Sequence, residues 1–168
     1  MKRVEMLVAG LALWLSATAA PAAAQPLPQW KMAAPLPQAI GEIVAATVGG
    51  KIYVISGLDN RPGVHAPAGD NWVYDPANDS WRQLAPMPTP RGAGEAVEVG
   101  GKIYVIGGAR SSKPGDPGAP ILLGSTDQLV VGTVEAYDPA TDKWQERAPM
   151  PTARNHFFAG AVNGKIYA

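Results

Sequence analysis

The clearest pattern along the chain is a pair of turn residues followed at once by a short apolar run. Gly49-Gly50 and Gly100-Gly101 each precede Lys-Ile-Tyr-Val-Ile, and Asn163-Gly164 precedes Lys-Ile-Tyr. Such pairs permit the positive φ angles of two-residue hairpin turns. The four consecutive apolar residues at 103–106 predict a strand that is covered on both faces. The pattern therefore predicts β-hairpins rather than long helices.

Several markers recur along the chain at the same two spacings. The turn pairs are 51 and then 63 residues apart. The same spacings relate three tryptophans and two Tyr-Asp-Pro sequences: Trp30, Trp81, Trp144, 74–76 and 137–139. Shared spacings of this kind indicate a repeat protein. Each unit of about 50 residues is expected to hold four short antiparallel strands, because proline ends the third strand and tryptophan opens the fourth.

The repeat resembles that of the kelch family. In that family an arginine leads the first strand, two glycines close the second, and tyrosine and tryptophan follow at set spacing. The matching residues are Arg91, Arg154, Gly107, Gly108, Tyr74, Tyr137, Trp81 and Trp144. The first unit departs from the pattern, with Ile40 in the arginine place and Ser56-Gly57 in place of the glycine pair. The resemblance covers nearly all of residues 30–168 and implies an all-β fold, a kelch-type β-propeller of four-stranded antiparallel blades.

The spacing divides the chain into blades. We expect blade 1 at residues 41–84, blade 2 at 85–147 and the start of blade 3 at 148–168. Propellers typically close with about 4–8 blades, so about two and a half blades make an incomplete propeller. The chain is therefore interpreted as a fragment of a longer protein, and self-assembly of partial propellers is the alternative. Residues 25–40 are expected to be an N-terminal segment whose strand, at Trp30-Lys31-Met32, closes the last blade.

The first 24 residues have the features of a secretory signal peptide. Lys2 and Arg3 precede an apolar run at residues 6–15, and three alanines at 22–24 suit a signal peptidase. The run is shorter than the roughly 18 residues that a membrane-spanning helix needs. We therefore expect residues 1–24 to be removed, and the mature chain to be periplasmic or secreted with no membrane span.

Composition excludes several kinds of site. Lysine plus arginine and aspartate plus glutamate number 14 each, so the formal net charge is zero and gives no basic surface for nucleic acid. With no cysteine, the chain has no disulfide, no cysteine-bound metal and no thiol nucleophile. No established catalytic, metal-binding or cofactor-binding motif occurs, so no cofactor is expected. The 19 glycines and 17 prolines are explained by repeated turns and strand ends.

Arg91 and Arg154 are the first candidate binding residues. The kelch resemblance implies that this arginine lies at the entry of the innermost strand of its blade, near a channel mouth. Two roles are open. The arginine can pair with a carboxylate or carbonyl of the neighbouring blade, because an unpaired charge is poorly tolerated when buried. Alternatively, its planar fork of donors can contact an anionic or polar ligand.

A second set of candidates comes from positions that differ while their surroundings repeat. Two residues after the arginine place, the three units carry Glu42, Ala93 and His156. Such a position is a candidate for recognition, although drift among three copies is the alternative. The loop between the second and third strands is 12 residues longer in blade 2, at 109–133, and contains Arg110. The kelch resemblance implies that this loop projects on the same face as the arginine-bearing connection, which would make it a lid or contact ridge at the mouth; the alternative is a tolerated surface insertion.

Two functional hypotheses fit these observations. The first is an exported kelch propeller that binds a protein or a glycan at its mouth, since the scaffold is repeated, its loops vary and no catalytic constellation is visible. The second is an enzyme, because exported bacterial kelch propellers include sialic-acid mutarotases. Copper oxidases resembling galactose oxidase also carry such a propeller, but their cofactor needs a cysteine that this chain does not have.

Overall fold

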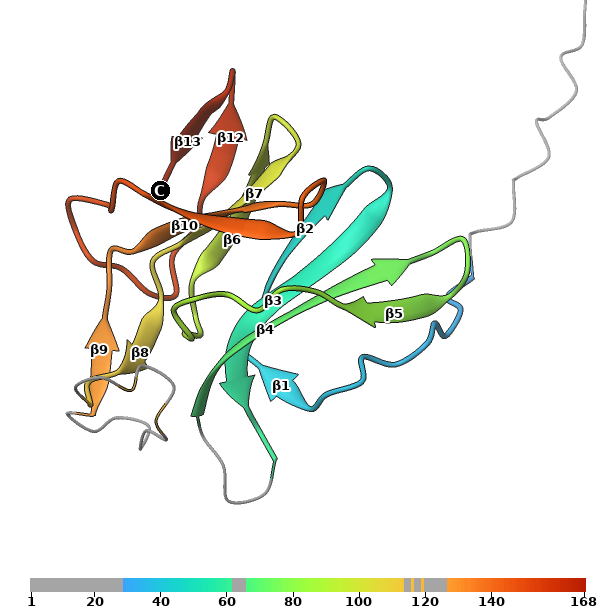
Figure 1. Ribbon diagram of the computed structural model, residues 1–168, viewed down its shortest axis with the longest axis horizontal. Helices are drawn as coiled ribbons and strands as arrows, with labels where there is room; N and C mark the ends of the chain where they lie inside the picture. Colours follow the sequence, from blue (N-terminus) through green and yellow to red (C-terminus); the bar gives the residue numbers. More distant parts are fainter. Residues whose placement is uncertain (1–28, 62–65, 114–115, 117–118, 120–126) are drawn as a thin grey trace, which may run out of the picture. The chain divides into compact units, whose positions relative to one another are not determined.

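A computed structural model describes residues 29–61, 66–113, 116, 119 and 127–168 (Figure 1). The predicted signal peptide, and parts of the loop at 109–133, lie outside these residues. The chain divides into two units, Met1–Met32 and Ala33–Ala168. The described part contains β-strands and turns without a helix, and so none that could cross a membrane. Trp30 and its neighbours are not in a strand, and the blade-closing role of this segment stays a prediction.

The first sheet has five strands, and four of them form an antiparallel series in chain order. These four are β2 (Val44–Val48), β3 (Lys51–Asp59), β4 (Ala66–Asp75) and β5 (Ser80–Gln83), each antiparallel to the next. A two-residue strand, β1 (Ile40–Gly41), pairs with the far end of β3. The turn glycines between β2 and β3 have positive φ angles, as the hairpin pattern predicted. We call this sheet blade 1.

The second sheet has four strands, in the same order as that series. Blade 2 consists of β6 (Glu95–Val99), β7 (Lys102–Ile106), β10 (Val134–Asp138) and β11 (Lys143–Arg147). Two short strands at the base of the long loop pair with each other, β8 (Ala109–Ser111) and β9 (Gln128–Val130). A hairpin of β12 (Gly160–Val162) and β13 (Lys165–Tyr167) follows and lies against β6 (Figure 1).

Two glycines show that the offset of 63 residues is also a structural equivalence. The carbonyl oxygen of Gly69 accepts from the N–H of Met87 at 2.7 Å, and that of Gly132 accepts from Met150 at 2.8 Å. A Cβ atom on either glycine would lie 2.7 Å from the carbonyl oxygen of the same methionine. The equivalence permits blade 1 and blade 2 to be compared residue by residue.

The main core lies between the two blades. Val44, Tyr53 and Ile55 of blade 1 pack in one cluster with Ile103 and Tyr137 of blade 2. Burying an aliphatic side chain of this size contributes about 1.5–3 kcal/mol. A second cluster joins blade 2 to the third hairpin through Val97, Ile106 and Ala159. The apolar run at 103–106 therefore serves both clusters, which explains why it carries no polar alternation.

Successive units are also joined by one repeated set of hydrogen bonds, which we call the alanine clasp. In blade 2, Trp144 Nε1 donates to the carbonyl oxygen of Ala85 at 2.9 Å, and the N–H of Ala85 donates to Asp142 Oδ1 at 3.0 Å. In blade 1, Trp81 and Asp79 hold both backbone groups of Ala34 in the same way, at 2.8 and 2.7 Å. The tryptophan repeat thus reports a contact between units.

Replacing Trp144 with phenylalanine tests the alanine clasp. The variant keeps an aromatic ring but removes the shorter of the two side-chain hydrogen bonds to the Ala85 carbonyl oxygen and leaves the one from Asn71, so we expect the free energy of unfolding to fall by about 1–3 kcal/mol. Urea unfolding followed by circular dichroism measures the change. Trp30→Phe is the matched control, because Trp30 is fully exposed and should leave the unfolding midpoint unaltered. Equal midpoints for the two variants would contradict the clasp.

The aspartate of the clasp makes stability depend on acid. Hydrogen bonds from the Tyr137 hydroxyl and then from the Ala85 N–H lower the pKa of Asp142 from its ordinary value of 3.8. Its stabilisation is therefore complete above pH 3.8 and is lost as the pH falls through the lower folded-state value. We expect Asp142→Asn to lower stability at pH 7 and to flatten the decline below pH 4 in acid titrations of the unfolding midpoint. Asp116→Asn, at an exposed loop position, should keep the wild-type decline.

Candidate functional site

The variable position after the arginine place has one unusual backbone conformation in all three units. Glu42, Ala93 and His156 have φ angles of 49°, 55° and 49°. This left-handed region is rare for residues other than glycine. Since three different residues adopt it, the conformation belongs to the repeat and the side chain is free to differ.

Hydrogen bonds join these three residues in a row. The N–H of Ala93 donates to the carbonyl oxygen of Glu42 at 3.1 Å, and the N–H of His156 donates to that of Ala93 at 2.9 Å. The row crosses from blade 1 to blade 2 and on to the third hairpin, so we call it the mouth ladder. Consecutive units thus present one side chain each, next to one another.

The outer members of the mouth ladder bring opposite chemistry together. His156 Nε2 lies 3.8 Å from Glu42 Oε1, and the two side chains are 62% and 34% exposed. The methyl group of Ala93 between them is buried. A carboxylate acceptor and an imidazole are therefore held side by side at an accessible surface, where both can contact a polar group.

Arg91 lies in the interior of blade 2. Its guanidinium pairs with Glu135 Oε2 and donates to the carbonyl oxygens of Gly107 at 2.9 Å, Thr89 at 2.9 Å and Val105 at 3.1 Å. The arginine and glutamate side chains are 1% and 5% exposed. Burial lowers the pKa of Arg91, and the bond to Glu135 opposes that shift. The geometry places Arg91 in the scaffold, with its carboxylate and carbonyl partners in its own blade.

The other two arginines lie elsewhere. Arg154 is exposed, and its carbonyl oxygen accepts from the N–H of Gly108 at 2.7 Å. Arg110 on β8 lines a separate groove over β10 and β11. Backbone bonds of 2.8 and 2.9 Å join Gly92 to Ala109, so the base of the long loop lies directly beside the mouth ladder. Of the five predicted site residues, Glu42 and His156 are brought together.

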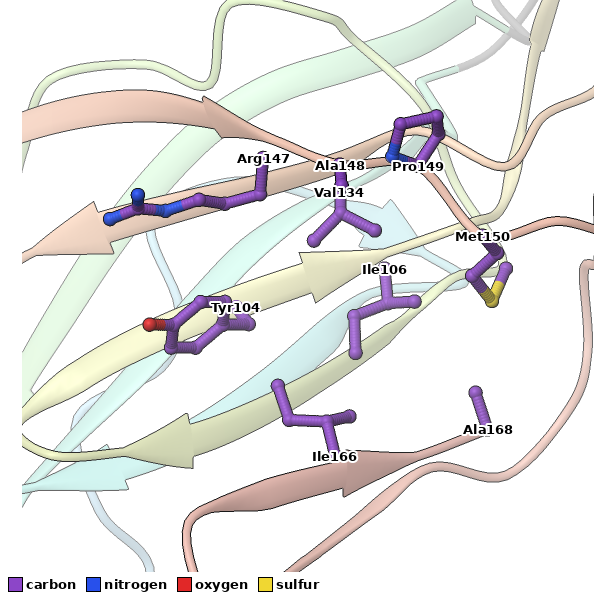
Figure 2. Close-up of a pocket in the computed structure, with 9 residues that line it drawn as sticks. All are labelled: Tyr104, Ile106, Val134, Arg147, Ala148, Pro149, Met150, Ile166 and Ala168. Atoms are coloured by element: carbon purple, nitrogen blue, oxygen red, sulfur yellow. The ribbon is translucent and has the colours of Figure 1, made fainter.

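A cavity of about 550 Å³ opens on the face of blade 2 toward the third hairpin (Figure 2). Tyr104, Ile106 and Val134 face Ile166 and Ala168 across it. In blade 1 the equivalents of Tyr104 and Ile106 are packed against aromatic side chains of the next blade; for instance, Tyr53 lies 6.1 Å from Tyr137 between ring centroids. We therefore interpret the residues that line the cavity as part of the packing between blade 2 and the third hairpin, and not as a ligand site.

Family models for the Kelch motif match residues 42–88 and 90–151. The chain belongs to the kelch-repeat family. It is 34% identical over 135 residues to Kelch-like protein 25 of Xenopus tropicalis, and 32% identical over 151 residues to human Kelch repeat and BTB domain-containing protein 12. These matches cover 80% and 82% of the chain. The chain spans about a fifth of these relatives, 21% and 22% of their lengths.

Among solved structures, the chain is similar to the one titled "Structure of YjhT", with a TM-score of 0.60 and 22% identity. The match covers 80% of this chain and 34% of that one. A likeness at this identity shows the fold. The prediction of an all-β kelch-type propeller, present here as an incomplete set of blades, is confirmed.

Glu135 and Glu146 were missed by the sequence interpretation. Their Cα atoms are partners in register across β10 and β11, and both line the groove that contains Arg110. At the offset of 63 their equivalents in blade 1 are Trp72 and Gln83, which also pair. Aligning the repeats already shows that two acidic residues replace two uncharged residues at paired positions. That difference is a signal in the sequence for a site at Glu135 and Glu146.

Removing one partner of the buried ion pair tests the scaffold role of Arg91. We expect Glu135→Leu to lower the free energy of unfolding by about 3–5 kcal/mol, because it leaves a buried guanidinium without its carboxylate. The double variant Arg91→Met/Glu135→Leu removes both charges and should recover most of that loss. Blade 1 is the precedent, since Ile40 and Trp72 stand at the two equivalent positions. A double variant no more stable than the single one, in urea unfolding, would contradict this role.

Proposed function

We propose that this chain is part of an exported kelch propeller that binds a protein or glycan ligand at the mouth ladder. Export rests on the signal peptide predicted at residues 1–24. The proposed contact residues are Glu42 and His156, with Arg154 in the same connection as His156. The family relationship supports the binding role, because a repeated scaffold with variable positions is a common basis for protein recognition.

One observation carries the proposal: the ladder backbone is the same in three units while its side chains differ. Each unit supplies a residue with left-handed backbone to the ladder: Glu42 accepts one backbone hydrogen bond, Ala93 donates one and accepts one, and His156 donates one. A glutamate, an alanine and a histidine all adopt this backbone. The side chains at these positions are therefore free to serve recognition. The two polar ones, Glu42 and His156, lie together at the surface.

A second candidate function is a sugar mutarotase. Opening a sugar ring requires a base to take the proton of the anomeric hydroxyl and an acid to protonate the ring oxygen. Glu42 and His156 supply a carboxylate and an imidazole 3.8 Å apart at an accessible surface. The pair therefore favours an acid–base reaction on a bound sugar over other enzyme classes.

The variant Glu42→Gln/His156→Asn tests both functions. Asparagine tolerates the left-handed backbone, so the fold should be kept while the charges and the imidazole are lost. Binding is measured with labelled chain on a glycan array and by enrichment from the organism's exported proteins, using wild type and variant side by side. We expect the ligand retained by wild type to bind the variant at least about tenfold more weakly, the loss of about 1.4 kcal/mol.

Glu98→Gln is the matched control, because Glu98 is an exposed glutamate of blade 2. Its variant should bind like wild type. Equal binding by the ladder variant would contradict the site. The enzyme alternative has its own measurement, the exchange of N-acetylneuraminic acid anomers followed by NMR, which wild type should accelerate and the ladder variant should not.

A further inference from the structure

A polar groove lies on the face of blade 2 that looks toward blade 1, apart from the mouth ladder. Its volume is about 480 Å³, within the range of small-molecule sites. We call it the Glu135 groove, after the buried glutamate among its lining residues, which include Thr89, Arg110, Thr133, Glu135, Trp144 and Glu146. Strand β10 supplies Glu135, β11 supplies Trp144 and Glu146, and β8 supplies Arg110, so strands form much of the groove wall.

Two glutamates stand directly opposite each other in this groove. Glu135 and Glu146 are partners in register, and like charges at such positions destabilise a sheet. Glu135 is fixed in place, since its Oε2 pairs with Arg91 and its Oε1 accepts from Thr89 Oγ1 at 3.1 Å. Glu146 is exposed and adds a second carboxylate beside it. An arrangement that costs stability is expected where function requires it.

The equivalent place in blade 1 is bridged by side chains. Gln38 Nε2 donates to Asp70 Oδ2 at 3.1 Å, and Gln83 Nε2 donates to Asp70 Oδ1 at 3.3 Å. These three residues correspond to Thr89, Thr133 and Glu146 at the offsets of 51 and 63. In blade 1, the side-chain amides of Gln38 and Gln83 thus bridge the two sides of this place through the carboxylate of Asp70.

Blade 2 has the same backbone but leaves this place open. Two threonines replace the longer Gln38 and Asp70, and Glu146 replaces the amide donor of Gln83. The glutamate has no hydrogen to donate in its ionised form, so it cannot form the bridge seen in blade 1. These three differences, together with Glu135 in the place of Trp72, distinguish the groove from the equivalent place in blade 1.

We propose that the Glu135 groove binds a neutral polyhydroxylated ligand, a sugar ring or the end of a glycan. The charges that line or hold it balance, with Arg91 and Arg110 against Glu135 and Glu146. A groove without net charge does not select an anion or a cation. It offers instead what hydroxyl groups need, namely acceptors and donors held close together.

Each lining residue has a role toward such a ligand. The carboxylates of Glu135 and Glu146 accept from hydroxyl groups, and the guanidinium of Arg110 donates to ring or hydroxyl oxygens. Thr89 and Thr133 can do either. Trp144 supplies the apolar surface that the carbon-bound hydrogens of a sugar can cover, while its Nε1 remains bonded to Ala85. Arg110 then contacts ligand in this groove rather than at the mouth.

The test converts the groove of blade 2 into that of blade 1. In Thr89→Gln/Thr133→Asp/Glu146→Gln the new residues reproduce Gln38, Asp70 and Gln83, so the groove should close without loss of the fold. Wild type and variant are titrated with methyl α-D-glucoside and methyl β-D-galactoside by calorimetry and saturation-transfer NMR. We expect millimolar binding of at least one glycoside by wild type, and at least about tenfold weaker binding by the variant.

Two further arms complete the design. Glucuronate and glucosamine carry the charges that the balanced groove should not favour, so tighter binding of either than of both methyl glycosides would overturn the assignment to a neutral sugar. Glu98→Gln is the control, because Glu98 is exposed and lies outside both the groove and the mouth ladder, and it should bind the glycosides like wild type. No binding of either glycoside by wild type, or equal binding by the closed-groove variant, would overturn the site, whatever the outcome at the mouth ladder.

Discussion

Successive units of this chain depend on backbone groups that one unit leaves unpaired and the next unit satisfies. Ala85 shows this most clearly through its N–H, which donates to Asp142 of blade 2, while its carbonyl oxygen accepts both from Trp144 of blade 2 and from Asn71 of blade 1. The mouth ladder does the same at the other end of the connection, from carbonyl to N–H. The hydrophobic effect that drives packing between the blades is non-directional, whereas these hydrogen bonds require limited ranges of distance and angle. They set the position of each blade against the last, and hence which side chains meet.

That arrangement separates two kinds of residue within each repeat. Tyr137, Asp142 and Trp144 stand where the clasp requires them, and their counterparts recur in blade 1. At Glu42 and Glu146, only the backbone takes part in the hydrogen bonds that hold the blades, and the side chains do not. The mouth ladder and the Glu135 groove both belong to this second kind. In such a chain, the candidate functional residues are those that differ between the repeats.

Much of the fold could be predicted from the sequence, because its signals are local. The turn pairs, the apolar run at 103–106 and the Tyr-Asp-Pro strand ends each act within a few residues of themselves. The site was harder to predict. The sequence showed that position 156 varies, but the approach of His156 to Glu42 depends on three units stacking in register. The aligned repeats mark Glu135 as unusual, but its pairing with Arg91, 44 residues away in the sequence, is seen only in the structure.

The left-handed backbone of the mouth ladder also restricts the chemistry that this surface can acquire. At φ near 50° a β-branched side chain is strained, so valine, isoleucine and threonine are poor occupants of positions 42, 93 and 156. Asparagine, aspartate, histidine and glycine are the easiest to accommodate. Variants of this surface, in nature or in a combinatorial library, are therefore restricted to fewer residue types, and many of these are polar or titratable. The backbone itself biases the ladder toward hydrogen-bonded ligands before any ligand selects it.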